Sequence, residues 1–92
     1  MIRVEKQNQG QFKVTVKEEG SSTTHTVNLE SDYYQELTGG KVSEEELIEK
    51  SFQFLLAREQ KESILSSFNL KVITRYFPEY GEKIKSEIGK GD

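Results

Sequence analysis

Residues 41–48 read KVSEEELI, and this stretch marks the start of a helix. Ser43 is suited to cap the first turn by accepting a hydrogen bond from the Glu46 N–H, while the Glu46 side chain can reach back to the Ser43 N–H. Val42 and Leu47 occupy the two positions of a hydrophobic staple. Three successive glutamates place negative charge at the positive end of the helix dipole. A helix that begins at Ser43 therefore organises the fold.

Apolar side chains continue at helical spacing after this start and predict a helix that runs to about residues 58–60. Before it, Ser31 or Asp32 can cap a short helix, which the glycines at 39–40 would end. The segment 61–68 is ambiguous, because Ile64, Leu65 and Phe68 have helical spacing but three serines interrupt it. A short helical turn is the favoured interpretation.

The last third of the chain carries two further helical signals. Asn69 can cap a segment whose apolar residues include Leu70 and Ile73. Pro78 forbids an undisturbed continuation of that segment and fits the first turn of a last helix. The sequence thus predicts three or four short helices.

The first third alternates apolar and polar residues with period two. Residues 2–6, 12–16 and 23–29 follow this pattern, with turn signals at 8–10 and 19–22. Three short strands joined by two short turns predict an antiparallel meander.

These patterns predict an α+β fold, a three-stranded antiparallel β-meander followed by three or four short helices packed on one face of it. We expect a single domain over residues 1–88 and a frayed C-terminal tail at 89–92. The predicted core consists of Val4, Phe12, Val14, Val16, Val27, Leu29, Leu37, Leu47, Ile48, Phe52, Leu55, Leu56, Ile64, Leu65, Phe68, Ile73 and Phe77.

Composition narrows the class of protein. The 92 residues leave room for one core. The net charge is −3, and residues 29–60 alone carry eight acidic and three basic side chains. The chain has no strongly basic segment of the kind that binds nucleic acid. The absence of cysteine excludes disulfides and thiolate metal sites, and no apolar run is long enough for a signal peptide or a membrane span. We therefore expect a cytoplasmic protein that neither crosses a membrane nor binds nucleic acid.

Candidate catalytic groups are few. His25 is the only histidine, and its place in a strand among threonines favours a structural role. The glutamates at 44–49 are typical of a solvated first turn, because they lack the loop of converging oxygens that a calcium site needs. The GGK at 39–41 lacks the spacing of a phosphate loop. We expect no enzyme activity, no metal and no cofactor.

The stretch RYFPEY at 75–80 is the densest aromatic cluster of the chain. Core packing at a helix junction is the favoured interpretation. The alternative is an anchor for a partner, because Tyr and Arg are enriched at interfaces. Arg75, Tyr76 and Tyr80 are accordingly the candidate partner-binding residues. The partner would be an unidentified protein or a second copy of the chain in a homodimer.

The order of elements also resembles a known class of regulator. A strand at 23–29, a helix at 31–38 and a helix from Ser43 resemble the ribbon-helix-helix family of small DNA-binding regulators and antitoxins. The resemblance implies a strand that pairs with its dimer mate in the major groove. Here that strand would present Thr24, Thr26 and Asn28 without an Arg or Lys, and the helix start is acidic. This function is the alternative hypothesis.

Over residues 23–85 the chain is similar to a family of short uncharacterised bacterial proteins. That family has no assigned activity, so the resemblance implies a bacterial cytoplasmic origin and carries over no functional residue. We expect a small non-catalytic protein-protein interaction module. The phrases that carry the resemblance are HTV at 25–27, LTGGKVS at 37–43, EELI at 45–48, SFQFLLARE at 51–59, KESIL at 61–65 and RYFPEY at 75–80.

Overall fold

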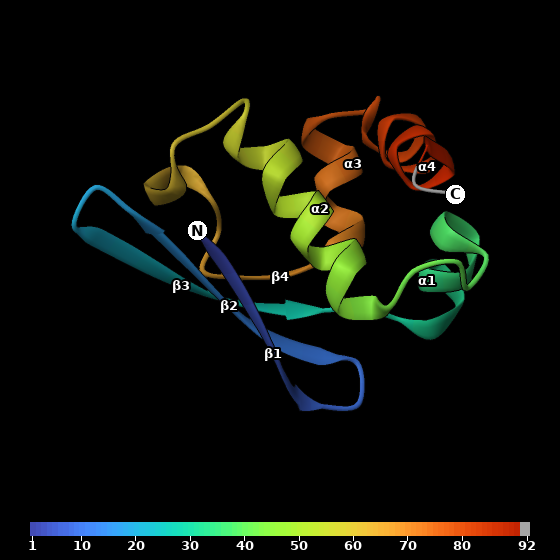
Figure 1. Ribbon diagram of the computed structural model, residues 1–92, viewed down its shortest axis with the longest axis horizontal. Helices are drawn as coiled ribbons and strands as arrows, with labels where there is room; N and C mark the ends of the chain where they lie inside the picture. Colours follow the sequence, from blue (N-terminus) through green and yellow to red (C-terminus); the bar gives the residue numbers. More distant parts are fainter. Residues whose placement is uncertain (91–92) are drawn as a thin grey trace.

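The computed structural model describes residues 1–90 and shows an α+β fold whose helices gather over one face of a four-stranded sheet (Figure 1). The strands lie in the order β1-β2-β3-β4. They are β1 (Ile2–Asn8), β2 (Gln11–Glu18), β3 (Ser21–Asn28) and β4 (Ser67–Asn69). The helices are α1 (Ser31–Thr38), α2 (Glu44–Leu56), α3 (Ile73–Tyr76) and α4 (Tyr80–Lys90), with 3₁₀ turns η1 (Lys61–Ser63) and η2 (Leu70–Val72).

The predicted meander is present as β1, β2 and β3, which pair antiparallel in sequence order. Phe12, Val14 and Val16 of β2 are fully buried, while Lys13 and Lys17 between and beyond them are exposed. The period-two pattern therefore identified the helix-covered face of the sheet correctly.

The predicted count of three strands is wrong by one, because β4 adds a fourth strand to the meander. It pairs with β3 in parallel, with Val27 opposite Phe68. The Thr26 N–H donates to the Ser66 carbonyl at 2.8 Å just before β4 begins. A strand of three residues is too short to show a period-two pattern, so no local signal predicts it.

Helix α2 starts directly after Ser43, as predicted, but within residues 1–90 the Glu46 side chain forms no return bond with the Ser43 N–H. Ser43 Oγ accepts a hydrogen bond from the Glu46 N–H at 3.0 Å, and Val42 packs partly buried against the core. For α1 the prediction of a side-chain cap by Ser31 or Asp32 is wrong, since Glu30 precedes the helix and forms no capping bond. Gly39 ends α1 in the left-handed conformation, with φ of 60°.

The C-terminal helices differ from the prediction at their boundaries. Pro78 lies two residues before α4 rather than inside its first turn. Helix α4 runs to Lys90, so residues 89 and 90 belong to it and not to a tail. Residues 91 and 92, the rest of the tail predicted at 89–92, lie outside the described residues.

One hydrophobic core lies between the sheet and the helices, and most of the predicted core residues belong to it. Leu65 is a correction, because 47% of it is exposed. Its neighbour Ile64 has an extended backbone, which turns Ile64 inward and lets Leu65 face out where helical spacing would have buried both. Three further predicted core residues are only half-buried, namely Val4, Leu56 and Phe77. The core also contains Tyr33, Phe54, Leu70, Tyr80, Ile84 and Ile88.

Candidate functional site

Large apolar side chains left in solvent are the first indication of a functional surface. Among the described residues these are Met1, Leu65 and Tyr76, exposed by 74%, 47% and 65%. Single exposed apolar residues are ordinary, whereas a cluster of them marks an interaction site. Leu65 and Tyr76 line the same cavity although eleven positions separate them in the chain.

That cavity, which we call the α2–α3 groove, has a volume of about 140 Å³. It is lined by Leu55, Glu59, Ser63, Ile64, Leu65, Phe68, Val72, Ile73, Tyr76 and Phe77. Four of these apolar residues are buried and form its floor, namely Leu55, Ile64, Phe68 and Ile73. A cavity of similar size lined by Leu, Ile and Phe can hold a benzene molecule. The groove therefore has room for one large apolar side chain.

The wall that carries Leu65 is held to the sheet by two hydrogen bonds that its backbone carbonyls accept. The Leu65 carbonyl accepts from Nδ1 of His25 at 2.7 Å, and the Ser66 carbonyl accepts from the Thr26 N–H at 2.8 Å. Both donors belong to β3. Because the backbone at 65–66 is fixed in this way, the groove is largely formed before a ligand arrives, and preorganisation of this kind lowers the entropic cost of binding.

His25 thus has the structural role that its sequence context predicted. Its Nδ1 donates to the Leu65 carbonyl, because a carbonyl can only accept, and its Nε2 lies 2.8 Å from Oγ1 of Thr23. The ring also packs against Phe52, with 5.4 Å between ring centroids. The side chain of His25 is buried.

The charged side chains near the groove differ in whether they form ion pairs. Arg58 pairs with Glu79 at 3.7 Å and stacks over the Phe54 ring at 3.7 Å. Lys61 is buried and pairs with Glu62 at 2.9 Å, and this contact lowers the pKa of the Glu62 carboxyl. Glu59 lines the groove and forms no ion pair within residues 1–90. This end of the groove therefore carries negative charge.

The three candidate partner-binding residues separate in the structure. Tyr76 lies on the rim of the α2–α3 groove. Arg75 is exposed but lies on the other side of α3, where it lines a second hollow. Tyr80 is fully buried, so its assignment to a partner surface is corrected. Leu65, which the sequence placed in the core, is the rim residue that sequence reasoning missed.

Tyr80 is buried because α2 offers its hydroxyl a partner. Ser51 Oγ uses its one proton to donate to the Leu47 carbonyl at 2.8 Å, so the Tyr80 hydroxyl donates to Ser51 Oγ at 2.5 Å. The Tyr80 ring packs edge-on against Phe54 at 5.3 Å. Burial raises the pKa of the Tyr80 phenol well above its usual range, so the phenol remains a donor. The serine within the apolar stripe of α2 was the sequence signal for this buried partner.

Within the part of the chain that the structure describes, no three His, Cys, Asp or Glu side chains come close enough to hold a metal ion. In the same residues, no helix combines the length and the apolar character needed to cross a bilayer. No protein-family model, curated protein or solved structure matches the chain.

Proposed function

We propose that the protein is a small, non-catalytic, cytoplasmic interaction module that seats one large apolar side chain of a protein partner in the α2–α3 groove. The observation that carries this proposal is the pair of exposed residues Leu65 and Tyr76 on the rim of a preformed, apolar-floored groove. Apolar anchors seated in such pockets supply most of the energy at many protein interfaces. A second copy of the chain is one candidate for the partner.

The alternative, a ribbon-helix-helix-like DNA-binding regulator or antitoxin, gains no support from the sheet. Such a regulator needs a free strand to pair with its dimer mate. The strand in question, β3, pairs with β2 along its length and with β4 over Thr26–Asn28. It has no open edge over those three positions.

Site-specific photo-crosslinking in cells of the source organism tests the proposal. A photoreactive phenylalanine analogue replaces Leu65 in one variant and Tyr76 in another. Thr24, which is exposed on the sheet, takes the same analogue in the control. We expect both groove variants to form a covalent adduct with one defined protein, and we expect the control to form none. An adduct with the chain itself identifies a homodimer.

The same adducts at position 24, or none at 65 and 76, would contradict the proposal. A further variant tests whether the two rim positions contact the same partner. Leu65→Asp places a charge on the groove rim without changing a buried position, so it should abolish the adduct formed at position 76. Circular dichroism of this variant checks that the fold is retained.

A further inference from the structure

A second hollow lies on the opposite side of α3 from the groove, between α1, α3 and α4, and has a volume of about 490 Å³. We call it the α3–α4 hollow. Three cationic side chains from three different elements line it, Lys71 of η2, Arg75 of α3 and Lys85 of α4. Glu36 is the one acidic side chain in its lining. The hollow is therefore cationic in a protein whose net charge is negative.

Two of the three cations have no counterion among the described residues. Lys71 Nζ lies 3.4 Å from a carboxylate oxygen of Glu30, but both side chains are about half exposed, so this pair is weak. For Arg75 and Lys85, residues 1–90 provide no ion pair and no side-chain hydrogen bond, and both side chains are exposed. The hollow thus presents two unneutralised positive charges to an incoming anion.

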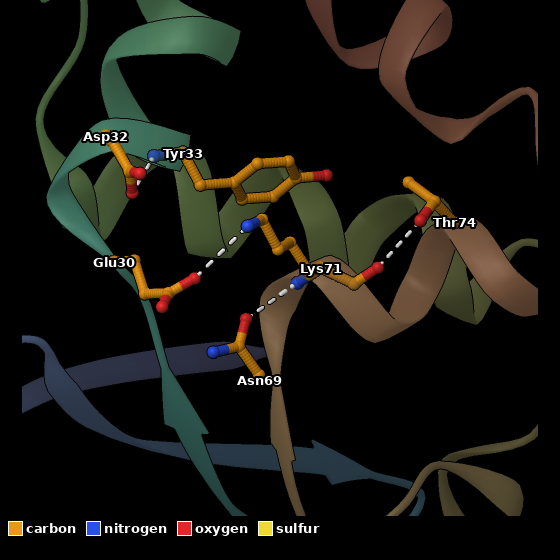
Figure 2. A network of polar contacts seen from close by, with 6 residues as sticks. All are labelled: Glu30, Asp32, Tyr33, Asn69, Lys71 and Thr74. Atoms are coloured by element: carbon orange, nitrogen blue, oxygen red, sulfur yellow. Dashed lines mark hydrogen bonds and ion pairs between the residues drawn. The ribbon is translucent and has the colours of Figure 1, made fainter.

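The lining of the hollow also includes Tyr33, a tyrosine whose hydroxyl is unsatisfied within residues 1–90. Tyr33 lines the hollow and is only 5% exposed, yet its hydroxyl is buried without a hydrogen-bond partner among the described residues. Figure 2 shows its ring extending from α1 past the Lys71 ammonium, with the hydroxyl end directed toward the side of Thr74. Burial, reinforced by Glu36, raises the pKa of the Tyr33 phenol, so it keeps its proton. A buried donor without an acceptor lowers stability, so this wall of the hollow is not optimised for folding alone.

The hollow and the groove adjoin each other. Val72 lines both, and the neighbouring residues Arg75 and Tyr76 face one cavity each. The wall between them is α3, a single turn of helix. An extended or helical segment that crosses α3 would place side chains a few positions apart into the two cavities.

We infer that the partner segment carries a carboxylate beside its apolar anchor, so that the anchor enters the α2–α3 groove while the carboxylate meets Arg75 and Lys85 in the α3–α4 hollow. This inference rests on the proposed function and names the class of partner, an acidic-hydrophobic peptide segment. Glu59 at the groove fixes the direction, because it repels the acidic part of the segment and leaves α3 as the side on which that part crosses. The complementary charges contribute specificity and a faster encounter.

Panning a library of random peptides displayed on phage against the full chain tests this inference. We expect the selected peptides to share a Leu, Ile, Phe or Met with an Asp or Glu a few positions away. A fluorescently labelled selected peptide then gives Kd for each variant by polarisation. The double variant Arg75→Gln/Lys85→Gln should weaken binding by about tenfold, as expected when two partly exposed ion pairs are lost.

Lys83→Gln is the matched control, since Lys83 is exposed on α4 but lines a different surface together with Phe54 and Arg58. It should leave Kd unchanged. Selected peptides without acidic residues, bound equally by the double variant but lost with Leu65→Asp, would overturn this inference and leave the proposed function intact. Peptides insensitive to both the double variant and Leu65→Asp would overturn the inference together with the proposed function.

Discussion

Single side chains with the same chemistry have opposite roles in this fold, depending on the partner each one finds. Tyr80 and Tyr33 are both buried tyrosines on helices. Tyr80 donates to Ser51, whereas the Tyr33 hydroxyl has no partner among the residues described. Hydrogen-bonded buried hydroxyls stabilise a fold modestly, while unsatisfied ones destabilise it.

Replacing each tyrosine by phenylalanine should therefore change stability in opposite directions. Tyr80→Phe should lower the free energy of unfolding by about 1 kcal/mol, because the bond to Ser51 is lost. Tyr33→Phe should raise it by up to about 1 kcal/mol, because the cost of burying an unpaired hydroxyl disappears. Urea unfolding measures both changes. A loss of stability in Tyr33→Phe would show that its hydroxyl is satisfied in solution.

The cap of α2 gives a second prediction at this scale. Ser43→Ala removes the acceptor for the Glu46 N–H and should lower the free energy of unfolding by about 1 kcal/mol. Ser86→Ala, the same change at an exposed position within α4, should leave stability unchanged or raise it slightly, because alanine is the better helix former. Equal melting temperatures for the two variants would refute the capping role of Ser43.

At the scale of the elements, glycines lie at the end of α1 and at the start of α4. Helix α1 ends at Gly39, whose positive φ turns the chain toward α2, and its N–H donates to the Gln35 carbonyl. Helix α4 starts at Tyr80, and Gly81 follows within its first turn and lines the α3–α4 hollow. A Cβ added at either glycine would meet no atom within 4 Å.

Because a Cβ fits at both positions, replacing either glycine by alanine tests only the effect of backbone conformation on stability. Gly81→Ala should raise the free energy of unfolding by about 0.5–1 kcal/mol, because alanine favours a helix. Gly39→Ala should lower it by about 1–2 kcal/mol, because φ of 60° is strained for alanine. Thermal unfolding of the two variants measures both changes, and a shift of the same sign in both would contradict this account.

The sequence predicted long periodic elements and failed on short ones, for a physical reason. The alternation in β2 and the stripe of α2 extend over several residues, so local spacing alone fixes which face is buried. The three residues of β4 acquire their strand conformation from β3, which lies about forty positions earlier in the chain. Leu65, on the groove rim, was misplaced for the same reason, since its carbonyl is bound by His25 of β3, forty positions earlier in the chain.

Tyr80 was misplaced by a related error, whereas Tyr76, which was assigned to the same surface, is exposed. Both aromatics belong to the cluster at 75–80, and the break at Pro78 resets the helical phase between them. Spacing alone could not decide which tyrosine turns inward after that break. The hydrogen bond with Ser51 on α2 favours Tyr80. Ser51 in the apolar stripe of α2 indicates a buried polar partner, but the stripe does not say which tyrosine reaches it.

At the scale of the whole molecule, one aromatic side chain joins the helical layer to both parts of the sheet. Phe52 of α2 is fully buried and packs against His25 of β3, with 5.4 Å between the ring centroids. Its ring centroid lies 6.1 Å from that of Phe68 in β4. The parallel pair of strands and the helix above them therefore share one packing centre.

Phe52→Ala should lower the free energy of unfolding by about 3–5 kcal/mol, because it leaves a cavity at this centre. Such a loss is a large part of the stability of a domain this small. Leu65→Ala is the control, since this exposed residue should lose less than about 1 kcal/mol. Guanidinium unfolding followed by circular dichroism compares them. Similar losses in the two variants would mean that Phe52 is not the packing centre.

The pairing of β3 with β4 also has a consequence for synthesis on the ribosome. His25 emerges from the ribosome forty residues ahead of Leu65, whose carbonyl later accepts its hydrogen bond. Throughout that interval β4 has not been synthesised, so the edge of β3 over Thr26–Asn28 has no partner strand. A polypeptide that ends before Ser67 therefore has an incomplete sheet, in which backbone N–H and C=O groups of β3 are unpaired. Chaperones and proteases should recognise such fragments far more readily than the finished molecule.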